Sequence, residues 1–168
     1  MATLPGLTLW HEGQADGRET FVPVFLSRRP DERLVASLAE WYHRLWECAA
    51  LVRRGDWILR EVHGWPDNTT AERLVAWTWV EADTLTLVVV NLGDAPADGV
   101  VTLDSDLVAG RDWLFTDLLD GATYQRSGDD VAKRGLYVAR PGWGAHVLQV
   151  TPATADAPGR TQAEGEHD

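Results

Sequence analysis

Leu74-Val-Ala-Trp-Thr-Trp-Val80 is followed, after Glu81-Ala-Asp83, by the apolar run Leu85-Thr-Leu-Val-Val-Val-Asn-Leu92. The first run changes character every second residue, which is typical of a β-strand with one buried face. The second run is apolar almost throughout, and Asn91-Leu-Gly-Asp94 ends it. The short link between the two runs favours a β-hairpin of two antiparallel strands.

The period of two extends over most of the chain on either side of this hairpin. Further strands are predicted near residues 57–63, 99–104, 113–117, 122–127, 135–140 and 144–150, separated by Asp-Gly, Ser-Gly-Asp and Pro-Gly turns. Many short strands at such spacing indicate two packed antiparallel sheets. The chain is therefore predicted to be mainly β, with an antiparallel β-sandwich of about eight strands.

Residues 31–54 have a different period, which predicts one long amphipathic helix. Apolar residues recur there in steps of three and four, at Leu34, Leu38, Tyr42, Leu45, Ala49 and Val52, with Val35, Trp41 and Trp46 widening the stripe. Asp31 is the expected N-cap, and Glu32 suits the positive end of the helix dipole. Gly55 is expected in the left-handed conformation that closes a helix.

The first thirty residues resemble one βα unit. Leu4-Pro-Gly-Leu-Thr-Leu-Trp-His-Glu-Gly-Gln14 predicts a strand and a loop, and residues 22–30 lead into the helix. A single βα unit cannot bury a parallel strand on both faces, so the chain looks like the end of something larger. The predicted organisation is a βα unit over 1–55, a sandwich over 56–150 and a disordered tail over 151–168.

These segments together resemble a known family. Leu4–Gln14 is similar to the last barrel strand of α-amylase-superfamily glycoside hydrolases, and Asp31–Arg54, with Trp41-Tyr42-His-Arg-Leu45, resembles the final barrel helix. The C-terminal β-sandwich of the family is resembled by Val88–Leu92, Trp113–Leu119, Gly135-Leu-Tyr137 and Trp143-Gly-Ala-His146. The resemblance implies the last βα unit of a barrel followed by the C-terminal sandwich.

Composition limits the classes of partner. The formal charge of −11 argues against nucleic acid and anionic membranes, because no basic cluster is large enough to neutralise phosphates. No apolar run is long enough to span a membrane and no signal peptide begins the chain, so a cytoplasmic location is expected. The single cysteine, Cys48, is expected to be a buried inert thiol. No cofactor and no metal site are predicted.

The catalytic machinery that the resemblance implies is not found in this sequence. Glycoside hydrolysis requires two carboxyl groups that flank the scissile bond. In the α-amylase superfamily these acids lie on earlier barrel strands, and no motif here matches them, so no catalytic residue is assigned. Asp117 is interpreted as an acceptor at a turn or strand end. We expect no catalysis by this chain alone, and glycoside hydrolase activity if the missing barrel is supplied.

Two groups of residues are candidates for contact with sugar. By the resemblance, His11, Glu12 and Gln14 belong to the loop after the last barrel strand, where barrel enzymes hold substrate; the alternative is a polar strand end. Trp65, in Gly-Trp-Pro, and Trp143, in Gly-Trp-Gly, occupy turns and are candidates for stacking on sugar rings. Trp77 and Trp79 share one strand face, and packing in the sandwich core explains them more simply.

Three functions remain open at this point. The first is a non-catalytic C-terminal part of an α-amylase-like glycoside hydrolase, with an accessory, stabilising role in carbohydrate metabolism. The second is a stand-alone carbohydrate-binding module that uses exposed tryptophans. The third is one chain of a split hydrolase or an oligomer-forming module. The corresponding partners are an α-glucan or small saccharide, a barrel-bearing chain, or a second copy held through the apolar helix stripe.

Overall fold

The computed structural model describes residues 1–20, 22, 23, 25, 28, 30–82 and 84–153. The chain divides into two compact units, Met1–Arg53 and Arg54–Asp168. The quoted segment 22–30 falls partly outside the described residues. So does the predicted tail, of which residues 151 and 152 belong to the last strand.

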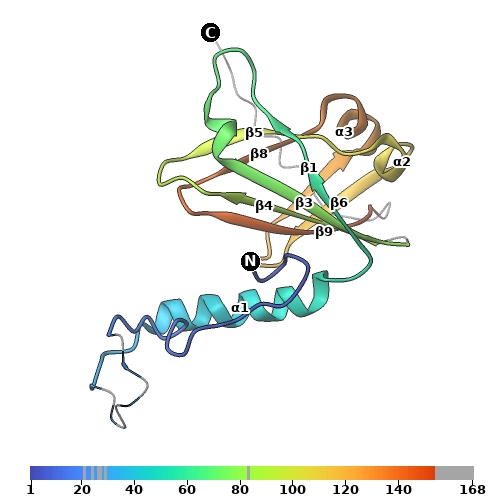
Figure 1. Ribbon diagram of the computed structural model, residues 1–168. Helices are drawn as coiled ribbons and strands as arrows, with labels where there is room; N and C mark the ends of the chain where they lie inside the picture. The colour runs from blue at the N-terminus through green and yellow to red at the C-terminus, as the bar shows by residue number, and fades with distance from the viewer. Residues whose placement is uncertain (21, 24, 26–27, 29, 83, 154–168) are drawn as a thin grey trace. The chain divides into compact units, whose positions relative to one another are not determined.

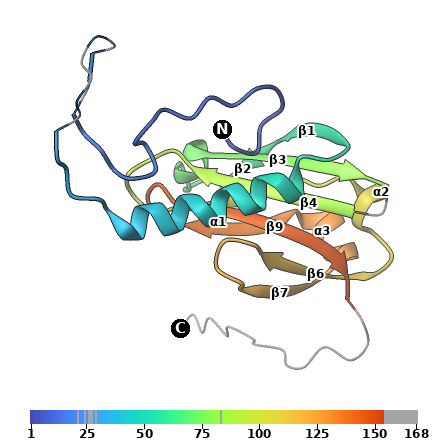
Figure 2. The same ribbon diagram turned by 90° about the horizontal axis from the view of Figure 1, so that it is seen from below.

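The second unit contains two antiparallel sheets, as the alternating sequence predicts (Figure 1). Its described strands are β1 Asp56–Arg60, β2 Val62–His63, β3 Leu74–Glu81, β4 Thr84–Asn91, β5 Ala97–Val101, β6 Asp112–Asp117, β7 Thr123–Ser127, β8 Leu136–Arg140 and β9 Ala145–Pro152. The larger sheet has the order β1-β3-β4-β9-β6-β7, which can be followed across Figure 2, and the smaller has the order β2-β5-β8. The mainly β sandwich is confirmed.

The hairpin predicted from Leu74–Val80 and Leu85–Leu92 lies inside the larger sheet, between β1 and β9. β3 and β4 pair antiparallel from Leu74 opposite Asn91 to Glu81 opposite Thr84. Every other strand predicted in the sandwich is present within a few residues of its expected place, except that the segment near 57–63 forms two strands. The chain passes from the larger to the smaller sheet at Glu61, whose carbonyl accepts a hydrogen bond from the N–H of Thr102 at 3.0 Å.

The core lies between the two sheets. It is made of aliphatic and aromatic side chains from the inner face of each sheet and from the short helices α2 and α3; its largest fully buried members are Phe115, Leu87, Leu103, Val89, Val101, Val108 and Val150. Burial of such side chains stabilises a domain by about 1.5–3 kcal/mol each. The packing of these side chains stabilises the sandwich, and the single cysteine of the chain cannot form an internal disulfide.

Trp77 and Trp79 are buried, with exposed fractions of 4% and 9%, but they do not lie in the core between the sheets. That core contains Leu74 and Ala76 of β3, so the alternate residues Trp77 and Trp79 point to the other face of the larger sheet. The expected position in the sandwich core is therefore wrong, although their burial is confirmed. Alternation shows which residues share a face, but it does not show which face meets the second sheet.

The outward face of the larger sheet is apolar over four strands. Residues that stand opposite one another form the row Leu59, Trp77, Val88 and Val147 across β1, β3, β4 and β9. The neighbouring row begins with Trp57 and Trp79 and becomes polar at Thr86, Gln149 and Thr116. We call the first row, with Trp57 and Trp79, the outer apolar face.

Three short helices connect the strands: the 3₁₀ helix η1 Thr70–Arg73, α2 Ser105–Val108 and α3 Gly128–Arg134. The Ser127-Gly-Asp sequence was predicted as a turn and instead begins α3. The Ser127 hydroxyl accepts a hydrogen bond from the N–H of Asp130 and so caps this helix. A helix of seven residues is too short for its period to stand out in the sequence.

In the first unit, helix α1 spans Ala36–Val52 and begins five residues after the predicted start at Asp31. Glu32 is engaged elsewhere: its Oε1 accepts hydrogen bonds from the N–H of Glu19 at 3.1 Å and from the N–H and hydroxyl of Thr20. The Thr20 backbone bond is the main cause that lowers the pKa of Glu32. Glu32 therefore fastens the preceding loop, and the N-cap position of α1 is Val35, without a side-chain cap.

The strand predicted over Leu4–Trp10 is not formed among the described residues. No other described segment of the chain pairs with it, and Leu7 and Leu9 are exposed. A strand needs a hydrogen-bonded neighbour, which this sequence does not supply. The segment meets α1 through side chains instead: the Trp10 ring lies edge-on to Tyr42 and to Trp46, with ring centroids 5.6 Å apart in each pair.

Candidate carbohydrate-binding surface

Trp65 is presented by a tight turn between β2 and η1. The N–H of Asn68 donates to the carbonyl of Trp65 at 2.8 Å, which closes a four-residue turn with Pro66 in its second position. Proline is favoured there because its ring fixes the backbone angle that the turn requires. Gly64 precedes the turn, and a Cβ at this position would lie 2.4 Å from the carbonyl oxygen of Asn68. The sequence Gly-Trp-Pro is thus well suited to this turn.

The turn places Trp65 beside Tyr137 of β8. The two ring centroids are 6.5 Å apart and the ring planes are inclined by 32°. Trp65 is 47% exposed and Tyr137 is 57% exposed. Two large rings that are 72 residues apart in the sequence therefore form one solvent-facing aromatic surface, which we call the Trp65–Tyr137 pair.

Asp98 of β5 joins the two sides of this surface. Its Oδ1 accepts hydrogen bonds from Asn68 Nδ2 at 3.1 Å and from the Thr70 hydroxyl at 2.8 Å. Its Oδ2 accepts from the Tyr137 hydroxyl at 3.2 Å. Partial burial raises the pKa of Tyr137, and the negative charge of Asp98 raises it further, so the phenol remains protonated at neutral pH.

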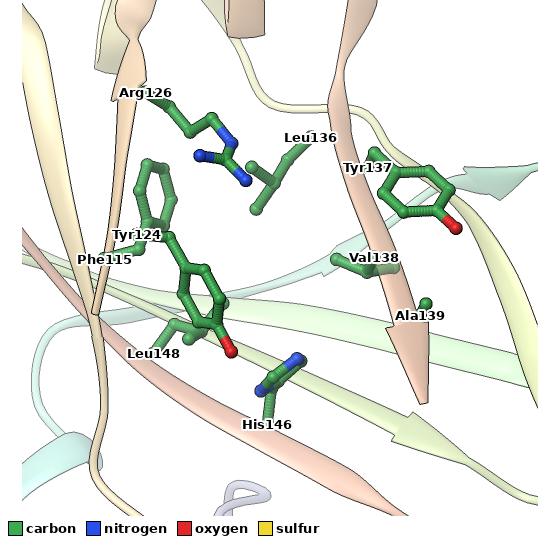
Figure 3. Close-up of a pocket in the computed structure, with 9 residues that line it drawn as sticks. All are labelled: Phe115, Tyr124, Arg126, Leu136, Tyr137, Val138, Ala139, His146 and Leu148. Carbon is green, nitrogen blue, oxygen red and sulfur yellow. The ribbon is translucent and has the colours of Figure 1, made fainter. Parts of the chain in front are cut away.

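Of these three residues, only Trp65 is predicted from the sequence as a site residue; Tyr137 and Asp98 are not. A signal for Tyr137 exists, because it stands between Leu136 and Val138, two apolar residues that share the opposite strand face. Figure 3 shows Tyr137 on the other side of the β8 ribbon from Leu136 and Val138. The pairing with Trp65 depends on the loop after β2, which strand periodicity does not describe.

Trp143 lies in the turn between β8 and β9 and is 70% exposed. Its backbone has a positive φ of 57°, and its N–H donates to the carbonyl of Gly93 at 2.8 Å. Within the described part of the chain, no second aromatic ring makes a ring contact with it. The structure therefore does not bring the two candidate tryptophans together into one ring pair.

His11, Glu12 and Gln14 lie close together in the first unit, in a turn closed by the N–H of Gln14 and the carbonyl of His11 at 3.1 Å. With Trp10 and Trp46 they line a hollow of about 350 Å³. The side-chain amide of Gln14 donates to the Tyr42 hydroxyl at 2.9 Å, which ties the turn to α1. A role of these three residues in sugar binding stays a prediction.

A cavity of about 200 Å³ opens between the sheets of the second unit, and Figure 3 shows Tyr124, His146 and Arg126 along it. Behind it, Nδ1 of the buried His146 lies 2.5 Å from Oδ2 of the fully buried Asp117. Nη1 of Arg140 lies 2.8 Å from each of the two ring nitrogens of His146. The ring is therefore engaged by Asp117 and Arg140 inside the sandwich.

Asp117 ends β6 and acts as the predicted strand-end acceptor. Besides His146, it accepts from the backbone N–H groups of Leu119 at 3.0 Å and Val147 at 3.3 Å. Burial opposes ionisation of Asp117, but these hydrogen bonds outweigh it and lower its pKa. Through its bonds to His146 and Val147, the Asp117 carboxylate links the end of β6 to β9.

The residues that the structure describes contain no group of three or more His, Cys, Asp or Glu side chains placed to hold a metal ion. None of their helices is both long and apolar enough to cross a membrane.

Sequence comparison gives no assignment: no family model matches the chain, and no curated protein matches it. Solved structures do match. The maltogenic α-amylase from Thermotoga neapolitana aligns with a TM-score of 0.60 and 15% identity, over 88% of this chain and 34% of that one. An Anoxybacillus α-amylase gives 0.52 and 22%, over 74% and 25%. The α-amylase of Geobacillus thermoleovorans, solved with acarbose, gives 0.55 and 14%, over the same shares.

These matches extend beyond the sandwich. The unit Arg54–Asp168 holds about two thirds of the 168 residues, so an alignment over 88% of the chain also includes residues of Met1–Arg53. The chain spans between a quarter and a third of the length of these enzymes. In fold, this chain corresponds to a portion of an α-amylase structure, as the sequence resemblance implies.

Proposed function

We propose that this chain is the non-catalytic C-terminal part of an α-amylase-like glycoside hydrolase, with its sandwich as a stabilising accessory domain. The observation that carries the proposal is the outer apolar face of the larger sheet. The outward side of an antiparallel sheet that meets water normally alternates to polar residues. Here it carries Leu59 and Trp77 in register with two valines, and Trp77 and both valines are buried.

Such a face is suited to packing against another apolar surface of the same enzyme. In the proposed role the catalytic barrel supplies that surface. The contact buries apolar surface of both domains and so stabilises the barrel. The fold likeness to a portion of three α-amylases supports the same role. No carboxylate pair has been assigned to catalysis, and the buried Asp117 is consumed by three hydrogen bonds inside the sandwich.

The test is complementation of a separate barrel. An α-amylase-type barrel without its C-terminal sandwich is purified, and its melting temperature and starch hydrolysis are measured with and without this chain. We expect no hydrolysis by this chain alone, and a higher melting temperature and activity of the barrel when the chain is added. Turnover by the chain alone that disappears in one of its own Asp or Glu variants contradicts the proposal.

A matched pair of variants locates the contact. Leu59 is an exposed leucine on the outer apolar face, and Leu92 is an exposed leucine just after β4. Leu59→Asp is expected to abolish complementation, because a carboxylate is costly to bury in an apolar contact. Leu92→Asp is expected to leave it unchanged. Equal effects of the two substitutions would show that the outer apolar face does not make the contact with the barrel.

A second candidate function is carbohydrate binding by the sandwich. The specific observation in its favour is the exposed Trp65–Tyr137 pair.

A further inference from the structure

We propose that the Trp65–Tyr137 pair, with the carboxylate of Asp98, is a binding site for an α-glucan chain. The site lies on the outward side of the three-stranded sheet, and no catalytic step is assigned to it. The inference deepens the proposed function and rests on it, because it names the ligand class that the accessory domain holds.

The first argument is the exposure of two adjacent rings that the backbone holds in place. Exposed aromatic surface is unfavourable in water, and neighbouring rings could reduce it by packing inward. Instead the Trp65 turn is closed by its own backbone hydrogen bond and is anchored through Asn68 and Thr70 to Asp98. A surface that is ordered before its ligand arrives loses little conformational freedom on binding.

The second argument is the combination of flat apolar rings with polar atoms beside them. One face of a glucose ring carries C–H bonds, while its hydroxyl groups project around the edge. An aromatic ring covers the C–H face, and a small number of polar groups fix the orientation, as in small-molecule sites generally. Asp98 Oδ2 accepts one hydrogen bond from Tyr137 and has a further lone pair for a sugar hydroxyl. A bond to a carboxylate is among the stronger ones.

The third argument is the angle between the rings. Successive glucose units of an α-1,4-linked chain turn relative to one another, whereas a β-1,4-linked chain is a flat ribbon. Ring planes inclined by 32° match units that turn, and a flat ribbon would favour coplanar rings. The geometry therefore favours an α-glucan over a β-glucan.

Size and charge disfavour the other classes of ligand. A large aromatic side chain presents about 150–250 Å², so two half-exposed rings offer about 200 Å², far below the ~800 Å² per partner of a stable protein interface. Single-stranded nucleic acid also stacks on aromatic rings, but it requires a positively charged groove. Here the polar group between the rings is the carboxylate Asp98, in a chain of formal charge −11.

The surface next to the rings has room for more of the chain. A hollow of about 450 Å³ is lined by Pro96, Asp98, Ala139, Arg140 and Pro141. Ala139 lies opposite Asp98 and two residues beyond Tyr137 on β8, so it shares the face of Tyr137. A glucan that stacks on the rings can therefore continue along β8 into this hollow.

The experiment measures binding of maltoheptaose to the full chain by calorimetry, with cellohexaose as the β-linked probe. Trp65→Ala and Tyr137→Ala are each expected to lower the affinity for maltoheptaose by about tenfold or more, which is about 1.4 kcal/mol. Trp143→Ala is the matched control, since it removes an exposed tryptophan outside the pair. It is expected to change the affinity by less than about twofold.

A gentler variant keeps the ring and removes the hydroxyl. Tyr137→Phe retains stacking but loses the bond to Asp98, so its affinity should fall between those of the wild type and Tyr137→Ala. The near-ultraviolet circular dichroism of each variant establishes that the sandwich is folded. If Trp65→Ala does not fold, Tyr137→Phe and Tyr137→Ala still decide.

Several results would overturn the inference. They are no binding of maltoheptaose at millimolar concentration, equal binding of cellohexaose, or a loss of affinity in Trp143→Ala that Tyr137→Ala does not show. None of these bears on complementation of a barrel, which is a separate readout. A chain that binds maltoheptaose but fails to stabilise a barrel keeps the site and loses the accessory role.

Discussion

The outward faces of the two sheets both carry aromatic residues, which are buried on the larger sheet and exposed on the smaller one. On the larger sheet Trp77 and Trp79 are 4% and 9% exposed, while on the smaller sheet Tyr137 and its neighbour Trp65 are about half exposed. Trp77 stands in a row with Leu59, Val88 and Val147, and Trp79 lies in the next row opposite Trp57 and Thr86. The exposed pair stands around a carboxylate.

The difference shows that the neighbours of a tryptophan, and not its strand position, indicate its role. A ring among aliphatic cross-strand partners belongs to a face that excludes water. A ring beside a hydrogen-bonded carboxylate belongs to a face that is open to solvent. We therefore assign packing to the first set and ligand contact to the second. Trp77→Ala, Asn68→Ala and Trp65→Ala test this division, and Asp117→Asn gives the cost of a buried polar contact for comparison.

The largest effect is expected for Trp77→Ala. Removing a buried tryptophan side chain costs about 3–5 kcal/mol of unfolding free energy, or about 10 °C in melting temperature for a chain of this size. Denaturant unfolding of the full chain measures it. If Trp77→Ala melts like the wild type but no longer binds maltoheptaose, the two faces have been assigned the wrong way round.

The next effect is expected for Asp117→Asn, which removes the charge that holds His146. Breaking a buried hydrogen-bonded pair costs about 3 kcal/mol or more at neutral pH. The folded-state pKa of Asp117 lies below its ordinary value of 3.8, so the stabilisation is complete above that pH. It is lost as the pH falls further, through the folded-state pKa.

Unfolding measured at a series of pH values checks this dependence. The difference in unfolding free energy between wild type and Asp117→Asn should be constant from pH 5 to 7, because that range lies above 3.8. The difference should shrink below pH 3.8. A difference that stays constant down to pH 2 would mean that the carboxylate does not stabilise the folded chain through its charge.

A smaller effect is expected for Asn68→Ala, which acts on the exposed face alone. The substitution removes the amide bonds to the carbonyl and carboxylate of Asp98, at 3.0 and 3.1 Å, for a loss of about 1–2 kcal/mol. It should also weaken maltoheptaose binding, because the Trp65 turn loses its anchor. Gln125→Ala, at an exposed amide with one long hydrogen bond, is the control and should change neither quantity.

The smallest effect on stability is expected for Trp65→Ala itself. Substitutions at exposed positions usually change stability by about 0.5 kcal/mol or less, so its melting temperature should stay within about 2 °C of the wild type. A loss as large as that of Trp77→Ala would show that Trp65 is part of the packing, and the contrast between the two faces would collapse.

Periodicity predicted most of the sandwich because a strand with one buried face alternates residue by residue in its own sequence, as Ala97–Val101 and Leu136–Arg140 do. It missed features that depend on distant residues. The strand at Leu4–Trp10 was expected from its composition, yet no described segment pairs with it. The start of α1 was misplaced because Glu32 binds the backbone of Thr20, an interaction that helix rules do not describe.

The candidate site was half predicted for the same reason. The Gly-Trp-Pro turn marked Trp65 as exposed, because glycine and proline act within a few residues. Tyr137 lies 72 residues later, and only the pairing of β5 with both β2 and β8 brings its sheet position near that turn. The sequence pattern contains the direction of the Tyr137 side chain but not the neighbour it meets.

The crossing at Glu61 has a consequence for how the chain responds to ligand. One segment of eight residues, Asp56–His63, contributes β1 to the larger sheet and β2 to the smaller, and the Trp65 turn follows directly. Separation of β2 from the smaller sheet therefore also disturbs β1, which is an edge strand of the larger sheet. Saturation with a ligand at Trp65 stabilises the folded state by RT ln(1 + [L]/Kd), about 2.7 kcal/mol at one hundred times Kd. Amide exchange should therefore slow in β3, although no sugar touches that strand.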